Sequence, residues 1–280
     1  MQSVALQPQD LALTILGNHL RAPGEAAWSG GMVQLLGEFG FSTEAARAAL
    51  NRLAARGLID RLRDGRQVHY RLTPRAEALL AEGDRRIFSF GEDRRSVDRW
   101  TVLWHSLPEA RRTERSRLGA RLRFLGFGLV QDAVWIAPRD HGEEVAALLH
   151  ALGVADHAYV LVGEPPGSLD VDAILMQAWD LDEVTARYEA FLAEFGPYRG
   201  RHDQRALDDL GAFVVRTRAT HLFRGFPLVD PELPDALMPD PRVRPRAVEL
   251  FHELYRGLRE PAERHFAEVA LHGVGRPAAA

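Results

Sequence analysis

Two residue types are missing from this chain of 280 residues, and each absence excludes a kind of chemistry. There is no cysteine, so disulfides, thiolate metal sites and cysteine nucleophiles are excluded. There is also no lysine, because all 35 basic residues are arginine. Schiff-base chemistry and a lysine general base are therefore excluded as well. A genome rich in G and C is the simplest explanation for the use of arginine alone.

Long apolar runs and common catalytic motifs are missing too. No run approaches the roughly 20 residues of a membrane span, and Met1 to Val4 lack the pattern of a signal peptide. We therefore expect a cytoplasmic protein with no membrane partner. Neither the glycine pattern Gly-x-Gly-x-x-Gly nor the serine elbow Gly-x-Ser-x-Gly occurs. Serine-histidine-aspartate chemistry on another scaffold remains open.

The segment from Ser42 to Thr73 has the pattern of a helix followed by a hairpin. Ser42 can cap the first helical turn, and Glu44 suits the positive end of the helix dipole. Gly57 is expected to end the helix after Arg56. An apolar stripe at helical spacing would pack inward and leave the opposite side free to enter a groove. The stripe contains Ala46, Ala49, Leu50 and Leu53.

After Gly57 the period changes to an alternation typical of strands. Asp64-Gly65 separates two alternating runs, which is a strong signal for a hairpin turn. In the second strand the alternation predicts two faces. Val68, Tyr70 and Leu72 would face one way, and Gln67, His69 and Arg71 the other.

Local charge supports a nucleic-acid interface. From Glu44 to Arg75 there are eight arginines against Glu44, Asp60 and Asp64, so 8 − 3 gives +5, whereas the whole chain is −4. Two supporting helices are expected at 9–20 and 31–39, which completes the layout of a winged helix-turn-helix. The alternative is a solvated helix with ordinary surface arginines. The residues expected to contact DNA are Ser42, Thr43, Arg47, Asn51, Arg52, Arg63 and Arg66.

The rest of the chain indicates an α+β multidomain protein. Thr73 caps a further helix that starts at Pro74 and runs towards Ile87. Strand, helix, strand, helix and strand then follow between residues 96 and 168, as in a ferredoxin-like split βαβ, and 129–130 would extend the second strand. The predicted parts are 1–95 (winged helix and linker helix), 96–168 (ferredoxin-like), 169–272 (mostly helical, for effector binding and dimerisation) and 273–280 (disordered tail). Helices are expected at 181–195, 207–223 and 246–258.

Four motifs in order carry a resemblance to a known family. They are Glu44 to Leu53 with Tyr70 to Pro74; Leu122 to Gly128 with Val134 to Arg139; Trp179-Asp180-Leu181; and His221 to Pro227 with Asp230 to Pro234. With these motifs the chain resembles the PaaX-type family of transcriptional repressors, which regulate phenylacetate catabolism. The resemblance implies a homodimeric repressor of double-stranded operator DNA, released by an aryl-acetyl coenzyme A thioester. One departure is Asp240-Pro241-Arg242-Val243-Arg244, where such proteins usually carry Trp-Pro-Gly.

An anionic thioester would require arginines beside an aromatic-lined cavity. The candidates for effector binding are Trp179, Arg187, Arg216, His221 and Arg224, with Arg218 also available. Packing and ion pairing are the competing interpretation of these residues.

Two enzymatic alternatives remain open at this stage. The middle of the chain resembles the small endoribonucleases of CRISPR adaptation, but Leu103 to Ser106 lack the aspartate that would hold a metal at the end of the first strand. A coenzyme A ester enzyme is the second alternative. We expect no metal or cofactor. His141, His150 and His157 fit no recognised ligand spacing and are interpreted as surface histidines.

Overall fold

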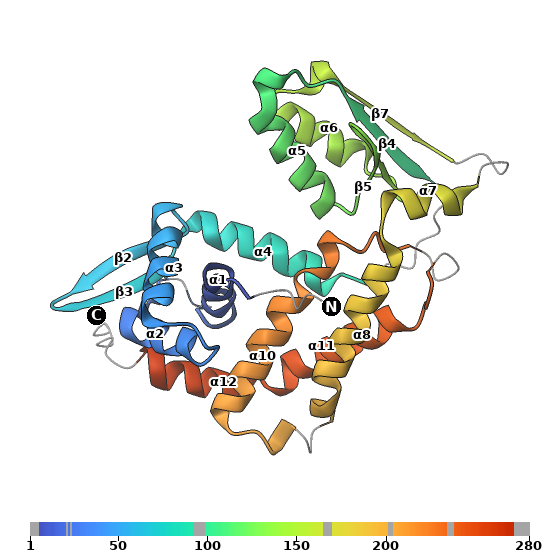
Figure 1. Ribbon diagram of the computed structural model, residues 1–280. Coiled ribbons are helices and arrows are strands. Elements are labelled where there is room, and N and C mark those ends of the chain that lie inside the picture. Colours follow the sequence, from blue (N-terminus) through green and yellow to red (C-terminus); the bar gives the residue numbers. More distant parts are fainter. Residues whose placement is uncertain are drawn as a thin grey trace. The chain divides into compact units, whose positions relative to one another are not determined.

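The computed structural model describes residues 6–20, 22, 24–91, 99–164, 170–200, 204–233 and 238–271. The chain forms two compact units (Figure 1). The first contains residues 1–86, 194–223 and 249–280, and the second contains 87–193 and 224–248. The boundaries expected near residues 95 and 168 and the tail 273–280 lie outside the described residues.

The first unit combines the N-terminal helices and hairpin with helices from the end of the chain. Its N-terminal elements are α1 (Pro8–His19), β1 (Ala27–Trp28), α2 (Ser29–Gly37), α3 (Thr43–Ala55), β2 (Ile59–Asp64), β3 (Gln67–Leu72) and most of α4 (Pro74–Phe88). Its C-terminal elements are α10 (Asp209–Phe223), the end of α11 (Val243–Gly257), α12 (Arg259–Phe266) and a short π-helix at Ala267–Leu271.

Capping residues define the helices as the sequence predicts. The Ser42 hydroxyl accepts a hydrogen bond from the Ala45 N–H at 3.2 Å. At the other end of α3, Gly57 has φ +65°, and the N–H of Leu58 donates to the Leu53 carbonyl at 3.0 Å. This pattern is a Schellman motif, which glycine can form without steric cost. The Thr73 hydroxyl caps α4 by accepting from the Ala76 N–H at 3.2 Å.

The hairpin is confirmed, but its turn lies one residue later than predicted. Asp64 still pairs with Gln67 as the last pair of the β2–β3 ladder. The two turn residues are therefore Gly65 and Arg66, and Gly65 carries the positive φ of +57°. Glycine takes that conformation more easily than aspartate does, and this preference places the turn at Gly65.

The His69 side chain is only 4% exposed, although Gln67 and Arg71 on the same face of β3 are more exposed. The cause is a third strand that the sequence analysis missed. β1 has two residues and pairs with β3, with Trp28 opposite His69 and Ala27 opposite Tyr70. The sheet order is β1-β3-β2, so β3 is the central strand. Central strands are covered more fully than the strands of an isolated hairpin.

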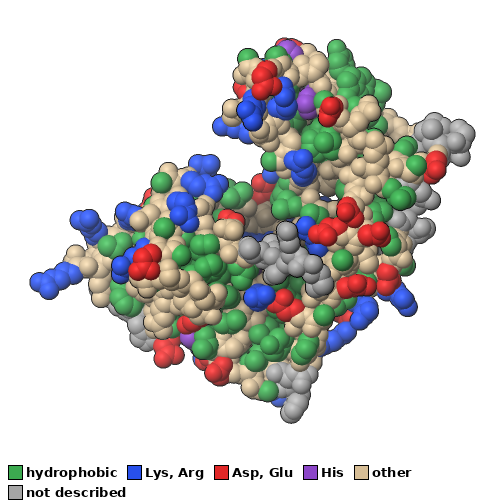
Figure 2. Space-filling view, viewed as in Figure 1, with side chains coloured by type: hydrophobic (Ala, Val, Ile, Leu, Met, Phe, Trp, Pro, Cys, Tyr) green, Lys and Arg blue, Asp and Glu red, His purple; other side chains and the backbone are tan. Residues whose placement is uncertain are grey.

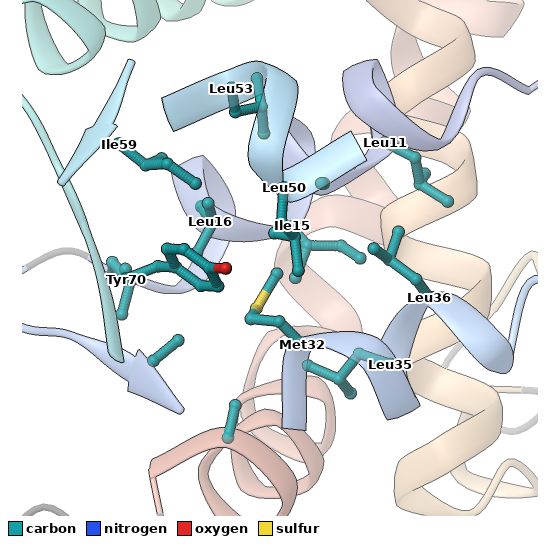
Figure 3. Close-up of a cluster of buried hydrophobic side chains, with 14 of the residues drawn as sticks. Leu11, Ile15, Leu16, Met32, Leu35, Leu36, Leu50, Leu53, Ile59 and Tyr70 are labelled. Atoms are coloured by element: carbon teal, nitrogen blue, oxygen red, sulfur yellow. The ribbon is translucent and has the colours of Figure 1, made fainter. Parts of the chain in front are cut away.

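One hydrophobic core joins the N-terminal helices to the hairpin. Figure 3 shows side chains from α1, α2, α3 and the two strands pointing towards one another. The C-terminal segment contributes Phe213, Ala262, Phe266 and Ala270 to the same core. His19 at the end of α1 stacks on Phe266 with ring centroids 4.7 Å apart. The predicted apolar stripes are confirmed, since the following residues are buried: Leu11, Ile15, Leu16, Leu35, Leu36, Ala46, Ala49, Leu50 and Leu53.

The second unit contains a four-stranded antiparallel sheet in the order β5-β6-β4-β7. In Figure 1, α5 and α6 lie on the same face of this sheet, and the core between them is built from Leu103, Leu118, Leu122, Trp135, Val145 and Leu149. The elements are β4 (Trp100–His105), α5 (Arg112–Phe124), β5 (Gly128–Gln131), β6 (Val134–Ala137), α6 (Gly142–Ala151) and β7 (Ala158–Gly163).

Leu129 and Val130 do not extend the second predicted strand as expected. They belong to a separate strand, β5, which folds back on β6. The connection is tight because Ala133 has φ +63°, an unusual value for a residue with a side chain. The register also shifts between Leu129 and Gln131, which is the disruption expected from a bulge.

Helices complete the second unit. They are α7 (Val171–Ala178), most of α8 (Leu181–Phe195), a 3₁₀ turn at Phe226–Leu228 and the first residues of α11. The predicted helices are confirmed, with α8 at the predicted bounds and α10 and α11 starting at Asp209 and Val243. Within the described ranges, no helix is long and apolar enough to cross a membrane.

A buried ion pair lies in this helical part of the second unit. Asp230 is fully buried and accepts two hydrogen bonds from Arg244, Nε to Oδ2 at 2.7 Å and Nη2 to Oδ1 at 3.0 Å. The Tyr188 hydroxyl donates to Oδ2 at 2.5 Å. Burial, and then the charge of Asp230, raise the pKa of Tyr188 well above its usual value, so the phenol remains a proton donor.

Replacing Asp230 by asparagine should destabilise the fold strongly. The change leaves the buried Arg244 guanidinium without a countercharge, which typically costs about 3–5 kcal/mol. Asp240→Asn is the matched control, because Asp240 pairs with an Arg242 side chain that is 82% exposed, and such pairs contribute at most about 1 kcal/mol. Urea unfolding of the two variants measures the difference. Equal midpoints would contradict the structural role of the buried pair.

Candidate nucleic-acid interface

The outer face of α3 is the first part of the candidate interface. Arg47, Asn51 and Arg52 are exposed, while the apolar stripe of the same helix is buried. Within the described part of the chain, no hydrogen bond or ion pair engages Arg47. Arg47 and Asn51 are one helical turn apart, so their side chains extend from the same face of the helix. A free guanidinium on such a face can donate two parallel hydrogen bonds to a guanine edge.

Asn51 is held by a residue that the sequence analysis missed. Arg61 on β2 donates a hydrogen bond to Oδ1 of Asn51, so the hairpin orients the amide on the helix. Arg61 also alternates outward with Arg63 along β2. This alternation predicts that the Arg61 side chain points outward, but it does not predict that the side chain reaches α3. An amide oxygen already engaged leaves the Asn51 NH₂ group available as a donor.

Arg52 differs from Arg47 because it is bound within the protein. Its Nε donates to Oε1 of Gln9 on α1 at 3.2 Å. This bond ties the face of α3 to the first helix. The position therefore supports the orientation of α3, in addition to any phosphate contact that the exposed guanidinium makes.

The tip of the hairpin is the second part of the interface. Arg63 and Arg66 are exposed on either side of the turn, and neither makes a hydrogen bond or ion pair with any residue that the structure describes. Figure 2 shows basic side chains at this tip, at the end of β2 and β3. Arg71 is different, since it pairs with Asp60 at 3.1 Å. The tip thus has two unpaired cations where a wing would meet a phosphate backbone.

The start of α3 carries Ser42, Thr43 and Glu44, all exposed. The Ser42 hydroxyl already caps the helix, whereas the Thr43 side chain makes no hydrogen bond to another described residue. Hydrogen bonds from its own backbone and then from Ser42 lower the pKa of Glu44. This carboxylate stays ionised at neutral pH and repels phosphate near the helix start. Contacts to DNA are therefore favoured further along α3, at Arg47 and Asn51.

The residues predicted to bind an effector fall in both units. Trp179, Arg187 and Arg224 belong to the second unit, and Arg216 and His221 to the first. Arg187 pairs with Glu183 at 2.8 Å. Arg216 is buried, donates to the Tyr255 carbonyl at 3.0 Å and lies over the Tyr255 ring. His221 Nδ1 lies 3.2 Å from the Thr14 hydroxyl. Each of these three has a structural partner.

A cavity of about 660 Å³ lies beside Trp179 in the second unit. Its apolar lining includes Leu175, Met176, Trp179 and Met238, and its polar lining includes Asp180 and Asp182. None of the arginines considered above lines it. A cavity of this size can hold a small aromatic group. The two carboxylates make it unfavourable for phosphates, so it suits the uncharged end of a ligand.

The described residues contain no group of three or more histidine, aspartate or glutamate side chains placed to hold a metal ion. His150 is exposed, while His141 and His157 are half-buried. His141 also pairs with Glu144 at 3.1 Å. The interpretation as surface histidines thus applies fully to His150 only.

Comparison with protein families gives three consecutive matches. They are the PaaX-like protein at residues 7–76, the PaaX protein central Cas2-like domain at 93–175 and the PaaX-like protein C-terminal domain at 179–268. The chain belongs to the PaaX family. Membership groups it with transcription regulators and not with enzymes.

One curated protein supports this assignment in sequence, and one solved structure is similar in fold. The transcriptional repressor PaaX of Escherichia coli K12 is 28% identical over 248 residues, which are 85% of this chain and 76% of that protein. The solved structure of the uncharacterized protein Rv0674 from Mycobacterium tuberculosis has a TM-score of 0.54. The structural match covers 93% of this chain and 99% of the Rv0674 chain, and the two sequences are 23% identical. At that identity the likeness concerns the fold alone.

Loss of the α3 side chains should reduce specific DNA binding. Removing one good bidentate base contact typically costs about 1–3 kcal/mol, so Arg47→Ala and Asn51→Ala should each weaken operator binding by one or two orders of magnitude. Random duplex should be affected less. Arg259→Ala, which removes an exposed arginine paired with Glu263, is the control for charge. Gel-shift titrations on operator selected from genomic DNA measure both effects, and unchanged affinity would show that α3 is not the reading helix.

Loss of the hairpin-tip arginines should weaken the electrostatic part of DNA binding and leave the preference for the operator sequence unchanged. Arg63→Ala with Arg66→Ala should weaken binding to all duplexes alike. The slope of log affinity against log salt should also fall by about 0.9 for each phosphate that the variant no longer neutralises. Sequence preference should survive, because phosphate contacts carry no direct sequence information. An unchanged salt slope would show that the hairpin tip does not contact DNA phosphates.

Proposed function

We propose that this protein is a DNA-binding transcriptional repressor of phenylacetate-like aromatic catabolism that works in the cytoplasm as a homodimer. The observation that carries the proposal is the set of unpaired, exposed Arg47, Arg63 and Arg66 on a capped helix and its hairpin. A duplex supplies the phosphates that these side chains lack as partners. The named relative is itself a transcriptional repressor.

The N-terminal part acts as a winged helix-turn-helix in this proposal. α2 and α3 supply the helix pair, α3 enters the major groove, and the β2–β3 hairpin is the wing. Support comes from the element order α1, β1, α2, α3, β2, β3 and from the third strand that braces the hairpin. A dimer would present two such readers, and their spacing would have to match two half-sites of an operator.

The sheet of the second unit is proposed to be a ferredoxin-like split βαβ. Its strand order β5-β6-β4-β7 puts the first and third strands of the motif in the centre, and α5 and α6 cover one face. It serves here as a scaffold and not as a nuclease. His105 ends β4 where a metal-binding carboxylate would be required. Burial and the charge of Arg115 lower the pKa of His105, which keeps the ring neutral.

We propose an aryl-acetyl coenzyme A thioester as the effector. The cavity beside Trp179 would hold the aromatic end, because its lining includes apolar side chains and two carboxylates but none of the candidate arginines. The phosphates would then require arginines elsewhere. Arg187 and Arg224 are the candidates in the second unit, and Arg216 and His221 are those in the first. An effector releases DNA only if it binds better to the conformation that binds DNA less well.

Binding of DNA and effector should therefore oppose each other to the same extent. Couplings of this kind are typically about 5- to 150-fold. Phenylacetyl coenzyme A should weaken operator binding by the full chain within that range, and operator should weaken thioester binding by the same factor. Trp179→Ala should abolish the coupling while leaving operator affinity intact. Titrations by fluorescence anisotropy measure all four affinities, and a full chain that ignores the thioester would exclude this effector while leaving DNA binding intact.

A further inference from the structure

The exposed face of α5 in the second unit carries a second group of unpaired arginines. Arg112, Arg117 and Arg123 are exposed, and none forms an ion pair with a carboxylate of the residues that the structure describes. Figure 2 shows basic side chains gathered over α5 on the face in view. The remaining exposed side chains of this face are small or hydroxylated, namely Thr113, Ser116 and Ala120. We define these six residues as the α5 basic face.

Acidic side chains near this face are already engaged elsewhere. Glu114 pairs with Arg111 at 3.8 Å, and Glu109 pairs with Arg115 at 3.3 Å. Several arginines elsewhere have carboxylate partners instead, in a chain whose acids outnumber its bases by 39 to 35. Examples are Arg187 with Glu183, Arg199 with Glu249, Arg259 with Glu263 and Arg264 with Asp209. Among the described residues, the α5 basic face thus shares the lack of ion-pair partners with Arg47 on α3 and with Arg63 and Arg66 at the hairpin tip.

Helix stability does not explain the pattern. Arg111 and Arg112 stand at the start of α5, where the helix dipole favours acids and disfavours bases. Arg117 and Arg121 are four residues apart, a spacing at which like charges repel. A preference for arginine over lysine explains the residue type but not this placement. Arg123 stands in the last turn, where the dipole favours a base. Helix stability therefore accounts for Arg123 but not for Arg112 and Arg117.

Packing explains only one of the three arginines. The Arg123 guanidinium lies 5.1 Å from the centre of the Trp135 ring, so it covers an aromatic side chain of the sheet. Arg112 and Arg117 have no aromatic ring beneath them among the described residues. These two are therefore available to an external anion.

We propose that the α5 basic face is an accessory surface for the phosphate backbone of duplex DNA. Arg112 and Arg123 are eleven residues apart, so the face extends about 16 Å along the helix, or about five base steps at 3.4 Å each. A row of that length on a convex helix fits a run of phosphates. A single ligand would instead require a cavity, and the cavity beside Trp179 contains none of these residues. Thr113 and Ser116 add hydroxyl donors of the kind that contact phosphate.

This inference rests on the proposed DNA binding and extends it beyond the winged helix. It predicts that duplex flanking the operator contributes to affinity through charge alone. Arg112→Gln with Arg117→Gln should lower the salt slope by about 0.9 for each phosphate that is no longer neutralised. Arg112→Lys with Arg117→Lys should retain the slope, because each lysine restores the charge. Sequence preference should not change in any of these variants.

The experiment compares the full chain with these variants on two duplexes, the operator alone and the operator with several turns of flanking sequence. Arg259→Gln with Arg264→Gln is the matched control, since both arginines are 61% exposed at the side chain but paired. Trimming the flanks should reduce the slope of the parent and of the control and leave that of the α5 variant unchanged. An α5 variant with the same slope as the control overturns the inference, whereas a parent that binds no duplex overturns the proposed function itself.

Two further measurements complete the test. Phenylglyoxal modification of the parent, read by mass spectrometry, should show Arg112 and Arg117 protected by the flanked duplex and Arg259 unprotected; equal reactivity overturns the inference and requires no variant. Free coenzyme A offers the same phosphate chemistry from a small molecule. If the α5 variant loses coenzyme A binding and keeps its salt slope, the face belongs to an effector and not to DNA.

Discussion

The stacking of His19 against aromatic side chains from the far end of the chain holds the first unit together. Its ring lies 4.7 Å from that of Phe266 and 5.4 Å from that of Phe213. A second close approach occurs at Gly31, where a Cβ atom would lie 2.3 Å from the Val269 carbonyl oxygen. The packing of α1 therefore depends on residues more than 180 positions later. A fragment of residues 1–95 would lack part of its own core, so the N-terminal segment does not separate cleanly from the rest of the first unit.

Buried carboxylates have a comparable role in the second unit. Asp230 and Glu232 lie in the motif that contributes to the family resemblance, and both have arginine partners, Arg244 and Arg139. Glu232 has φ +54°, which is unusual for a residue with a side chain, and it also accepts a hydrogen bond from the Gly91 N–H. It thereby joins the segments that follow α4 and β6. These contacts give the carboxylates of the motif a structural role. Arg244, which pairs with Asp230, lies in the segment that departs from the usual Trp-Pro-Gly.

The lack of a partner separates three exposed arginines of α3 and the hairpin tip from arginines beside them that are bound within the protein. Composition alone cannot make that distinction, since every basic residue is arginine. Arg52 and Arg71 are bound to neighbours, while Arg47, Arg63 and Arg66 are not. Because exposed ion pairs contribute little to stability, leaving these side chains unpaired has little cost for folding. It keeps them available for phosphates.

Short-range patterns in the sequence were sufficient for the elements of the candidate interface. The cap at Ser42, the stop at Gly57, the apolar stripe of α3 and the hairpin each depend on residues within a few positions of one another, so local sterics and hydrogen bonding determine them. Three predictions could not be made this way. The burial of His69 depends on a two-residue strand that is stable only when paired, the bond between Arg61 and Asn51 depends on how the hairpin packs on α3, and the turn at Gly65 depends on strand register.

The sequence by itself determined the helices, the hairpin and the local excess of positive charge, because periodicity and capping act over one or two turns. Only the tertiary structure decided which arginines are paired, which carboxylates are buried and which distant segment completes the N-terminal core. Those outcomes depend on contacts between residues that are far apart in the sequence, such as His19 with Phe266 or Tyr188 with Asp230. No local sequence pattern links such residues. Burial and pairing are properties of packed surfaces, and the packing exists only after the chain has folded back on itself.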